Sequence, residues 1–386
     1  MQAIARPNND TLYINTVMDL RTEPVIASYP AFDSKFVALE ISAYDHYVDI
    51  PLSTTKGDFK KPTKVLYYTK RTQGYDGEPV EGVDKIIEMT GDFAVAFLRV
   101  MPHAAEPERL EKNLAAMKEV KAVTLAEHLG QSPKPVEEAP FPAFQPSDAD
   151  IYENNFLEVM QFVVNHTTFD RDNELDQAFL AALEPLGIVP GKAYDPTSYA
   201  EINWEVLRTV AEAVVRQQLD IALDPDASSS IAMEMFKPKG EMSLNALLFQ
   251  SVIGPIGQPA TEVIYSQIVS ADGGAMNANR DYVVRMDAEE LPPAKAFWSF
   301  TLYDTENGFF MPNDRKKYSV GENAGMKLDE NGGIEVYVAA EKPEGVPEEN
   351  WLPINRKDED MDIVLRIYEA DLDKMKTWEA PKAEKL

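Results

Sequence analysis

Short apolar segments with strand-like alternation occupy the first hundred residues. They are rich in aromatic and β-branched residues, are bounded by Pro, Gly or Asp, and comprise Thr11–Met18, Phe36–Ile41, Val65–Tyr68 and Phe93–Val100. Turn sequences such as Tyr75-Asp76-Gly77 separate them. Short strands at regular spacing are typical of an antiparallel sandwich.

The same pattern returns after residue 260. The candidate strands are Glu262–Ser270, Arg280–Met286, Ala296–Tyr303, Gly333–Ala339 and Asp362–Glu369. Turn sequences such as Glu306-Asn307-Gly308 lie between them. We predict a second sandwich here, similar to a jelly roll.

Between the two strand-rich regions the apolar period changes to that of a helix. Helices are predicted at Glu106–Leu129, Ile151–Val164, Asn173–Leu186, Thr197–Ala222 and Met242–Gln250. Ser198 and Glu201 are placed to form a capping box for the fourth of these. The proline-rich segment 131–148 predicts an extended tether.

This pattern divides the 386 residues into three parts. We predict an N-terminal β-sandwich at 1–103, a helical segment with its tether at 104–250, and a C-terminal jelly-roll-like domain at 251–386. The fold class is therefore mainly β, with two antiparallel sandwich or jelly-roll-like domains and helices between them.

Charge and composition exclude several functions. A formal net charge of −28 disfavours nucleic acid and anionic membrane surfaces as partners. The absence of cysteine excludes disulfides, thiolate catalysis and thiolate zinc sites. No apolar run approaches the roughly 20 residues of a membrane span. Residues 1–7 lack the basic and apolar regions of a signal peptide.

Several short sequence motifs are similar to those of one two-domain family. Arg6-Pro-Asn-Asn-Asp-Thr-Leu-Tyr13, followed by Asp19-Leu20 and Glu23-Pro24, resembles the signature of the DUF1254 domain. Phe297-Trp-Ser-Phe-Thr-Leu-Tyr-Asp304, Asn350-Trp-Leu-Pro353 and Leu365-Arg-Ile-Tyr368 resemble the DUF1214 domain. Several words in one order are more specific than one short motif.

The resemblance implies two β-sandwich or jelly-roll-like domains of unknown function, with helices between them. Members often carry an export signal, and further residues usually precede the first signature. The resemblance therefore suggests a missing N-terminal segment and a periplasmic or secreted location, with the cytoplasm as the alternative.

One polar cluster in the first domain is a candidate catalytic site. It contains Tyr13, Asp45 and His46, because a histidine near an aspartate can act as a general base. Asn8, Asp10 and Tyr44 are candidate ligand-binding residues, and strand alternation would place Tyr44 and His46 on one face. The alternative is an Asn-Asn-Asp-Thr turn held by side-chain-to-backbone hydrogen bonds, with an ordinary histidine.

The second domain offers a further set of aromatic and charged candidates. Aromatic rings with arginine and aspartate can form a sugar-binding platform. The candidate residues are Trp298, Tyr303, Arg315, Trp351 and Arg366. Trp351, two residues before Pro353, is expected to be exposed. Asp304 is a candidate partner for a buried Arg366, and alternation alternatively makes Trp298, Phe300 and Leu302 one buried face.

Metal and cofactor signatures are weak. Asp170, Asp172, Glu174 and Asp176 alternate as in a calcium loop, but Leu175 stands where that loop requires glycine. We predict no structural metal and no cofactor.

Three hypotheses follow. The first is a binding protein for a small polar ligand or carbohydrate. The second is a hydrolase or lyase using His46, Asp45 and Tyr13, and the third is an interaction scaffold using segment 131–148. Homo-oligomerisation is possible because sheet edges must be paired or covered.

Overall fold

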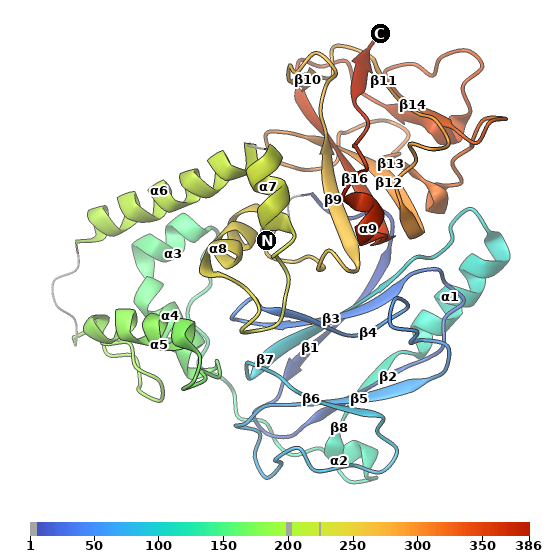
Figure 1. Ribbon diagram of the computed structural model, residues 1–386. Coiled ribbons are helices and arrows are strands. Elements are labelled where there is room, and N and C mark those ends of the chain that lie inside the picture. The colour runs from blue at the N-terminus through green and yellow to red at the C-terminus, as the bar shows by residue number, and fades with distance from the viewer. Residues whose placement is uncertain (1–5, 198–202, 224) are drawn as a thin grey trace.

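Two β-sandwiches and a helical segment form the molecule, and the computed structural model describes residues 6–197, 203–223 and 225–386 (Figure 1). In Figure 1 the first sandwich lies at the bottom, the second at the upper right, and helices α3 to α6 at the left. The fold class is mainly β, as the alternation pattern predicts.

Two four-stranded sheets make the first sandwich. One has the order β1(Leu12–Asp19), β7(Phe93–Val100), β3(Val37–Ala43) and β4(Val48–Ser53). The other has the order β6(Lys85–Glu88), β5(Thr63–Tyr68), β2(Val25–Tyr29) and β8(Lys121–Thr124). Alternate residues of β3, β5 and β7 point into the core, including Leu39, Tyr67 and Leu98. The other face of the β1–β7–β3–β4 sheet is turned toward the rest of the molecule.

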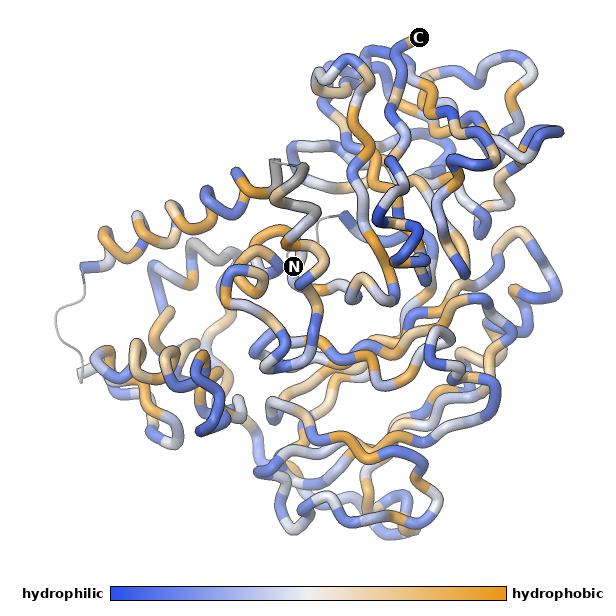
Figure 2. The backbone as a smooth tube through the Cα atoms, viewed as in Figure 1, coloured by the Kyte–Doolittle hydropathy of each residue, from blue (hydrophilic) through white to orange (hydrophobic). Residues whose placement is uncertain are grey.

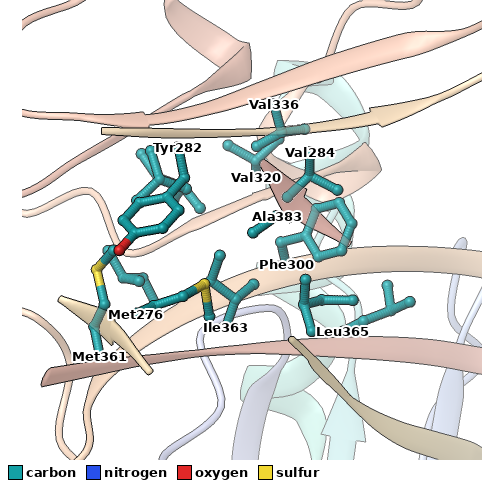
Figure 3. Packing of buried hydrophobic residues seen from close by; sticks show 14 of the residues in the cluster. Met276, Tyr282, Val284, Phe300, Val320, Val336, Met361, Ile363, Leu365 and Ala383 are labelled. Carbon is teal, nitrogen blue, oxygen red and sulfur yellow. The ribbon is translucent and has the colours of Figure 1, made fainter. Parts of the chain in front are cut away.

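The second sandwich has the same two-layer plan. Its first sheet has the order β10(Met276–Asn277), β16(Asp360–Ala370), β12(Ala294–Asp304) and β13(Ser319–Gly321), and β9(Val263–Ile268) also pairs with β16. Its second sheet has the order β15(Trp351–Pro353), β14(Ile334–Ala339), β11(Tyr282–Met286) and β17(Ala383–Lys385). Figure 3 shows Val284 and Val336 of one sheet facing Phe300 and Leu365 of the other. Trp298, Phe300 and Leu302 all belong to this core, so their prediction as one buried face is confirmed.

Helices cover the region between and beside the sandwiches. They are α1(Pro107–Glu119), α2(Leu125–His128), α3(Asp148–Asn154), α4(Phe156–Asn165), α5(Glu174–Leu183), α6(Trp204–Leu223), α7(Pro225–Ala232), α8(Leu244–Ile253) and α9(Leu372–Met375). Short 3₁₀ turns lie at Glu184–Leu186, Glu322–Ala324 and Glu348–Asn350. Side chains of Ser147, Asn173 and Ser243 cap the starts of α3, α5 and α8.

The helix predicted at Glu106–Leu129 is wrong in its second half. It ends at Glu119, and β8 follows and pairs with β2. The β-branched residues of β8 favour a strand, and Thr124 then starts α2 with a capping box. The antiparallel expectation also fails for two strand pairs, β5–β6 and β14–β15, which are parallel.

Helix α6 confirms a helix within the predicted range 197–222, although Ser198 and Glu201 lie outside the described residues. Figure 2 shows hydrophobic and hydrophilic positions alternating along it. Among the described helices, none is both long and apolar enough to cross a bilayer.

The three parts of the chain share one apolar cluster. Phe36, Val48 and Met101 of the first sandwich meet Phe297 and Tyr368 of the second. The helical segment adds buried residues to the same cluster: Met235, Phe236 and Phe249. This cluster fixes the first sandwich against the second, and polar residues lie at its edge.

Candidate functional site

A turn at the entry to β1 carries the first polar residues of this junction. The Asn8 side-chain oxygen accepts hydrogen bonds from the backbone N–H groups of Asp10, at 2.6 Å, and Thr11, at 3.3 Å. The predicted side-chain-to-backbone turn is therefore present. It also directs Asp10 away from the first sandwich.

Asp10 binds hydroxyl groups of the second sandwich. Its Oδ2 accepts hydrogen bonds from Ser299 on β12, at 2.5 Å, and from Tyr368 on β16, at 3.0 Å. Asn8 also donates to the Tyr368 hydroxyl at 2.8 Å. Burial raises the pKa of Asp10, although the positive charge of Arg366 and the two hydroxyl donors act in the opposite direction. Two segments at opposite ends of the sequence are joined here.

Arg366 lies beside this joint and is 3% exposed. Its Nη1 donates to Thr301 Oγ1 at 2.9 Å, and its Nη2 donates to the Tyr303 hydroxyl at 2.7 Å and to the Arg6 carbonyl at 3.1 Å. Its Nε has no acceptor among the described residues. The sequence predicted Asp304 as the partner of Arg366, and this is wrong: Asp304 instead accepts hydrogen bonds from backbone N–H groups of its own loop, those of Asn307 and Phe309.

A second buried guanidinium belongs to the first sandwich. Arg99 on β7 forms an ion pair with Glu40 on β3, with 2.6 Å between Nη2 and Oε2. Its Nη1 donates to the Tyr13 hydroxyl at 3.3 Å, and its guanidinium carbon lies 5.2 Å from the Tyr13 ring centre. Burial raises the pKa of Glu40, against the opposing effect of Arg99. Tyr13 itself is 37% exposed.

Tyr265 on β9 brings the two guanidinium groups into one site. Its ring centre lies 6.0 Å from the Arg366 guanidinium carbon. Both Arg99 and Arg366 act electrostatically on its hydroxyl, as do Tyr13 and Glu40. Desolvation is the largest cause that raises the pKa of Tyr265, yet 36% of the residue is exposed. Tyr265 is therefore a partly exposed ring beside the Arg366 guanidinium and within electrostatic reach of Arg99.

The predicted acid–base set is only partly brought together. Asp45 accepts from Thr90 at 3.0 Å, and Lys239 lies 3.8 Å from its Oδ2. Tyr13 pairs with Arg99 in the sheet, whereas Ala43, two residues before Asp45, pairs with Ala94. Five strand residues separate these levels, about 17 Å. Tyr13 therefore lies at the other end of the sheet from Asp45 and His46.

The expected alternation of Tyr44 and His46 is wrong. Strand β3 ends at Ala43, so both residues lie in the turn before β4, and His46 has a φ of 59°. The Tyr44 ring packs on Phe93 and Phe162, with centroid distances of 6.0 and 6.1 Å. Tyr44 therefore helps to attach the helical segment to the first sandwich.

The aromatic candidates of the second domain are dispersed. Trp298 lies in the sandwich core, and Tyr303 donates to the Pro7 carbonyl at 2.5 Å. Trp351, expected to be exposed, is 4% exposed, and its Nε1 donates to the Ala339 carbonyl at 2.8 Å. It is part of β15, which explains its burial. The Arg315 guanidinium carbon lies 4.8 Å from the centre of the Trp351 ring, away from the joint.

Sequence reasoning missed four residues of this site: Glu40, Arg99, Tyr265 and Gln258. Glu40 and Arg99 each interrupt an apolar strand, which was a signal for a buried pair. Gln258 is 1% exposed, its backbone N–H donates to the Tyr265 hydroxyl at 3.4 Å, and neither side-chain polar atom has a described partner. No sequence signal marked Gln258 or Tyr265.

The remaining histidines and acids form separate local contacts. The His103 side chain is hydrogen-bonded to Glu106, and the His166 side chain is hydrogen-bonded to Asp92. The acidic segment at 170–176 borders a surface recess of about 450 Å³, with Lys239 and Tyr47 on its wall. Within the described ranges, no three His, Asp or Glu side chains are arranged to hold a metal ion.

The proline-rich segment lies against the first sandwich. Arg21 donates to the Glu137 carbonyl at 2.7 Å, and Glu23 accepts from the Lys134 backbone N–H at 2.8 Å. Phe141 packs on Phe93 with ring centres 5.1 Å apart. A second recess, also about 450 Å³, lies between this segment and β1.

The fold places the chain in the class of two-domain β-sandwich proteins, and in this chain the turn before β1 docks on the second sandwich. Residues 1–123 match the DUF1254 family and residues 261–372 match the DUF1214 family, both described as proteins of unknown function. The chain belongs to this two-domain DUF1254/DUF1214 family.

One solved structure supports the same fold. The VPA0106 protein from Vibrio parahaemolyticus is similar over 99% of this chain and 90% of its own, with a TM-score of 0.75 and 23% identity. A putative uncharacterized protein from Burkholderia cenocepacia aligns over 99% of this chain and 77% of its own, with a TM-score of 0.43 and 13% identity. No curated protein matches the chain.

Proposed function

We propose that the protein binds a small polar ligand, such as a carbohydrate, at the junction of the two sandwiches. One observation carries the proposal: Tyr13 and Tyr265, from different domains, each expose about a third of their surface, and each lies against a buried guanidinium. Tyrosine offers an apolar ring for the C–H face of a sugar and a hydroxyl for hydrogen bonding.

Unpartnered polar atoms around these rings add support. Arg99 Nε, Arg366 Nε, Glu40 Oε1 and both amide atoms of Gln258 are buried without a described partner. Buried polar groups are normally hydrogen-bonded, and leaving one unpaired costs about 1–3 kcal/mol. A polar ligand at the junction would offer hydrogen-bond acceptors and donors to these unpartnered atoms.

The enzyme alternative has less support. A hydrolase or lyase using Tyr13, Asp45 and His46 requires these side chains to meet, and about 17 Å of sheet separates Tyr13 from the other two. Burial raises the pKa of Asp45. The nearby charge of Lys239 and the hydrogen bond from the Thr90 hydroxyl act in the opposite direction, and both groups are already partners of this carboxylate.

A binding screen with matched variants tests the proposal. We expect at least one compound in a panel of mono- and disaccharides, polyols and hydroxy acids to give saturable heat in titration calorimetry. Tyr265→Ala and Tyr13→Ala should each weaken that binding about tenfold, because an aromatic contact is lost. Tyr337→Ala is the control, since Tyr337 lies on β14 and bonds Glu335. Absence of saturable binding across the panel, or equal binding by all variants, contradicts the proposal.

A further inference from the structure

We propose that the ligand is a hydroxylated carboxylic acid, whose carboxylate binds Arg366 and whose hydroxyl binds Gln258. This inference rests on the proposed function, because it names the ligand class of the same site. It starts from a difference between the two buried arginines.

Among the described residues, Arg99 has a carboxylate partner in an ion pair and Arg366 has none. The Arg99 charge is compensated by Glu40 at 2.6 Å. All described acceptors of Arg366 are neutral oxygens, namely Thr301 Oγ1, the Tyr303 hydroxyl and the Arg6 carbonyl. A fully buried cation without an anionic partner is unfavourable. Arg366 is therefore the group at this junction that gains most from an added anion.

Asp10 does not take this role. It acts electrostatically on Arg366, but its Oδ2 is occupied by Ser299 and Tyr368, and no described ion pair joins it to Arg366. The Arg366 Nε–H finds no acceptor in the described part of the chain. A charge-assisted hydrogen bond to a carboxylate oxygen would satisfy it.

Gln258 indicates the second functional group of the ligand, its hydroxyl. Its side-chain amide contains both a donor and an acceptor, and neither has a described partner. A hydroxyl group also donates and accepts, so it matches a free amide. Gln258 and Arg366 both neighbour Tyr265, through a 3.4 Å hydrogen bond and a 6.0 Å ring contact.

Binding requires a small movement, because both free groups are buried. Tyr265 neighbours both groups and is 36% exposed, so a change of its side-chain rotamer would open access to them. Side-chain rotamer changes of this kind are common at binding sites.

A carboxylate fits better than a phosphate. Of the two guanidinium Nε atoms without a described partner, that of Arg99 belongs to a cation already paired with Glu40, so Arg366 is the one that would receive the anion, beside the neutral amide of Gln258. A phosphate dianion is usually held by several charged or backbone donors. The overall charge of −28 also disfavours a doubly charged ligand.

Titration calorimetry with matched pairs tests the ligand class. The probes are D-glucuronate against D-glucose, D-galacturonate against D-galactose, and L-lactate against propane-1,2-diol. We expect at least one acid to bind ten times or more tightly than its neutral partner. Equal affinities that still depend on Tyr265 overturn the carboxylate inference and leave the proposed function standing. If none of the six binds, the carboxylate inference is overturned, and the wider panel decides the proposed function.

Two variants locate the contacts. Arg366→Gln should reduce the acid to the affinity of its neutral partner. Because Arg366 also holds the Arg6 carbonyl, circular dichroism must show that this variant is folded. Gln258→Leu removes an amide without a described partner, so it should leave the melting temperature unchanged while weakening acid and neutral compound alike by about tenfold. Unchanged acid binding by folded Gln258→Leu contradicts the assignment of the hydroxyl contact.

Discussion

Asp10, in the turn before β1, accepts a hydrogen bond at 3.0 Å from the hydroxyl of Tyr368, which lies 358 positions later in the chain. Both residues belong to sequence words that mark the family, one in the DUF1254 region and one in the DUF1214 region. The Tyr368 ring also stacks on Phe297 of the second signature, with centroids 3.9 Å apart. The two signatures therefore meet in one structural joint, which gives a physical reason for their occurrence in one chain.

Removing the Asp10 carboxylate should weaken this joint. In Asp10→Ala the hydroxyls of Ser299 and Tyr368 lose their acceptor, which costs about 2–4 kcal/mol of unfolding free energy. Urea denaturation followed by tryptophan fluorescence measures the change. Asp314→Ala, at an exposed position, is the control and should change the value by less than about 0.5 kcal/mol. Equal effects of the two variants would show that Asp10 does not hold the joint.

The Glu40–Arg99 pair should be sensitive to single substitution. Glu40→Ala leaves a buried guanidinium without its carboxylate, which costs about 3–5 kcal/mol. The double variant Glu40→Leu/Arg99→Met should recover much of this loss, because no charge remains buried. The exposed pair Arg285–Glu335 offers a comparison, and Glu335→Ala should cost at most about 1 kcal/mol. A double variant as unstable as Glu40→Ala contradicts this explanation.

Glu262 should make stability depend on pH. Burial is the largest cause that raises its pKa, and the nearby Glu369 carboxylate acts in the same direction, whereas hydrogen bonds from Ser53 and Thr55 and the charge of Lys56 oppose it. A raised pKa in the folded state means that the contribution of Glu262 is complete below its unfolded pKa, about 4.5. It is lost as the pH rises through the folded pKa.

The variant Glu262→Gln measures this dependence. Relative to the original protein, it should become more stable as the pH increases from 4.5 to 7, because it has no proton to lose. Urea unfolding at several pH values gives the difference. A constant difference across this range would show that the pKa of Glu262 is the same in the folded and unfolded states.

Phe141 should hold the proline-rich segment in place. Its ring lies 5.1 Å from those of Phe93 and Phe162, whereas Phe144, nearby in sequence, is 80% exposed. Phe141→Ala should increase proteolytic cleavage within 131–148 several-fold, without a matching loss of global stability. Phe144→Ala should leave the cleavage rate unchanged. Identical rates for both variants would mean that the ring contacts do not attach the segment.

The sequence predicted the parts of the fold that depend on local pattern. Alternation located β1, β7, β12 and β16 to within about two residues, because each has one face in a sandwich core. It failed at β8, where two β-branched residues, Val123 and Thr124, stand among charged and helix-favouring neighbours and the strand is completed by pairing with β2. Strand pairing across the chain is a tertiary interaction, and local propensity does not reveal it.

The candidate site was predictable only in part for the same reason. Asp10 and Arg366 stood out because each is a charged residue within a recognisable family motif. Tyr265 and Gln258 became visible only through their neighbours, since an exposed tyrosine on β9 has no distinctive pattern. Trp351 was misplaced because its burial depends on the parallel pairing of β15 with β14, between segments separated by a loop.

The position of the Asn8–Asp10 turn also constrains how the molecule is made. Ribosomes synthesise this turn 358 residues before they add its hydroxyl partner on β16. At about 5–20 residues per second, the turn waits roughly 20–70 s for that partner. The first sandwich has all its strands by residue 124 and is able to form during this interval. Closure of the joint is therefore a late event in biogenesis, and until then a nascent chain presents its DUF1254 signature without a partner of its own.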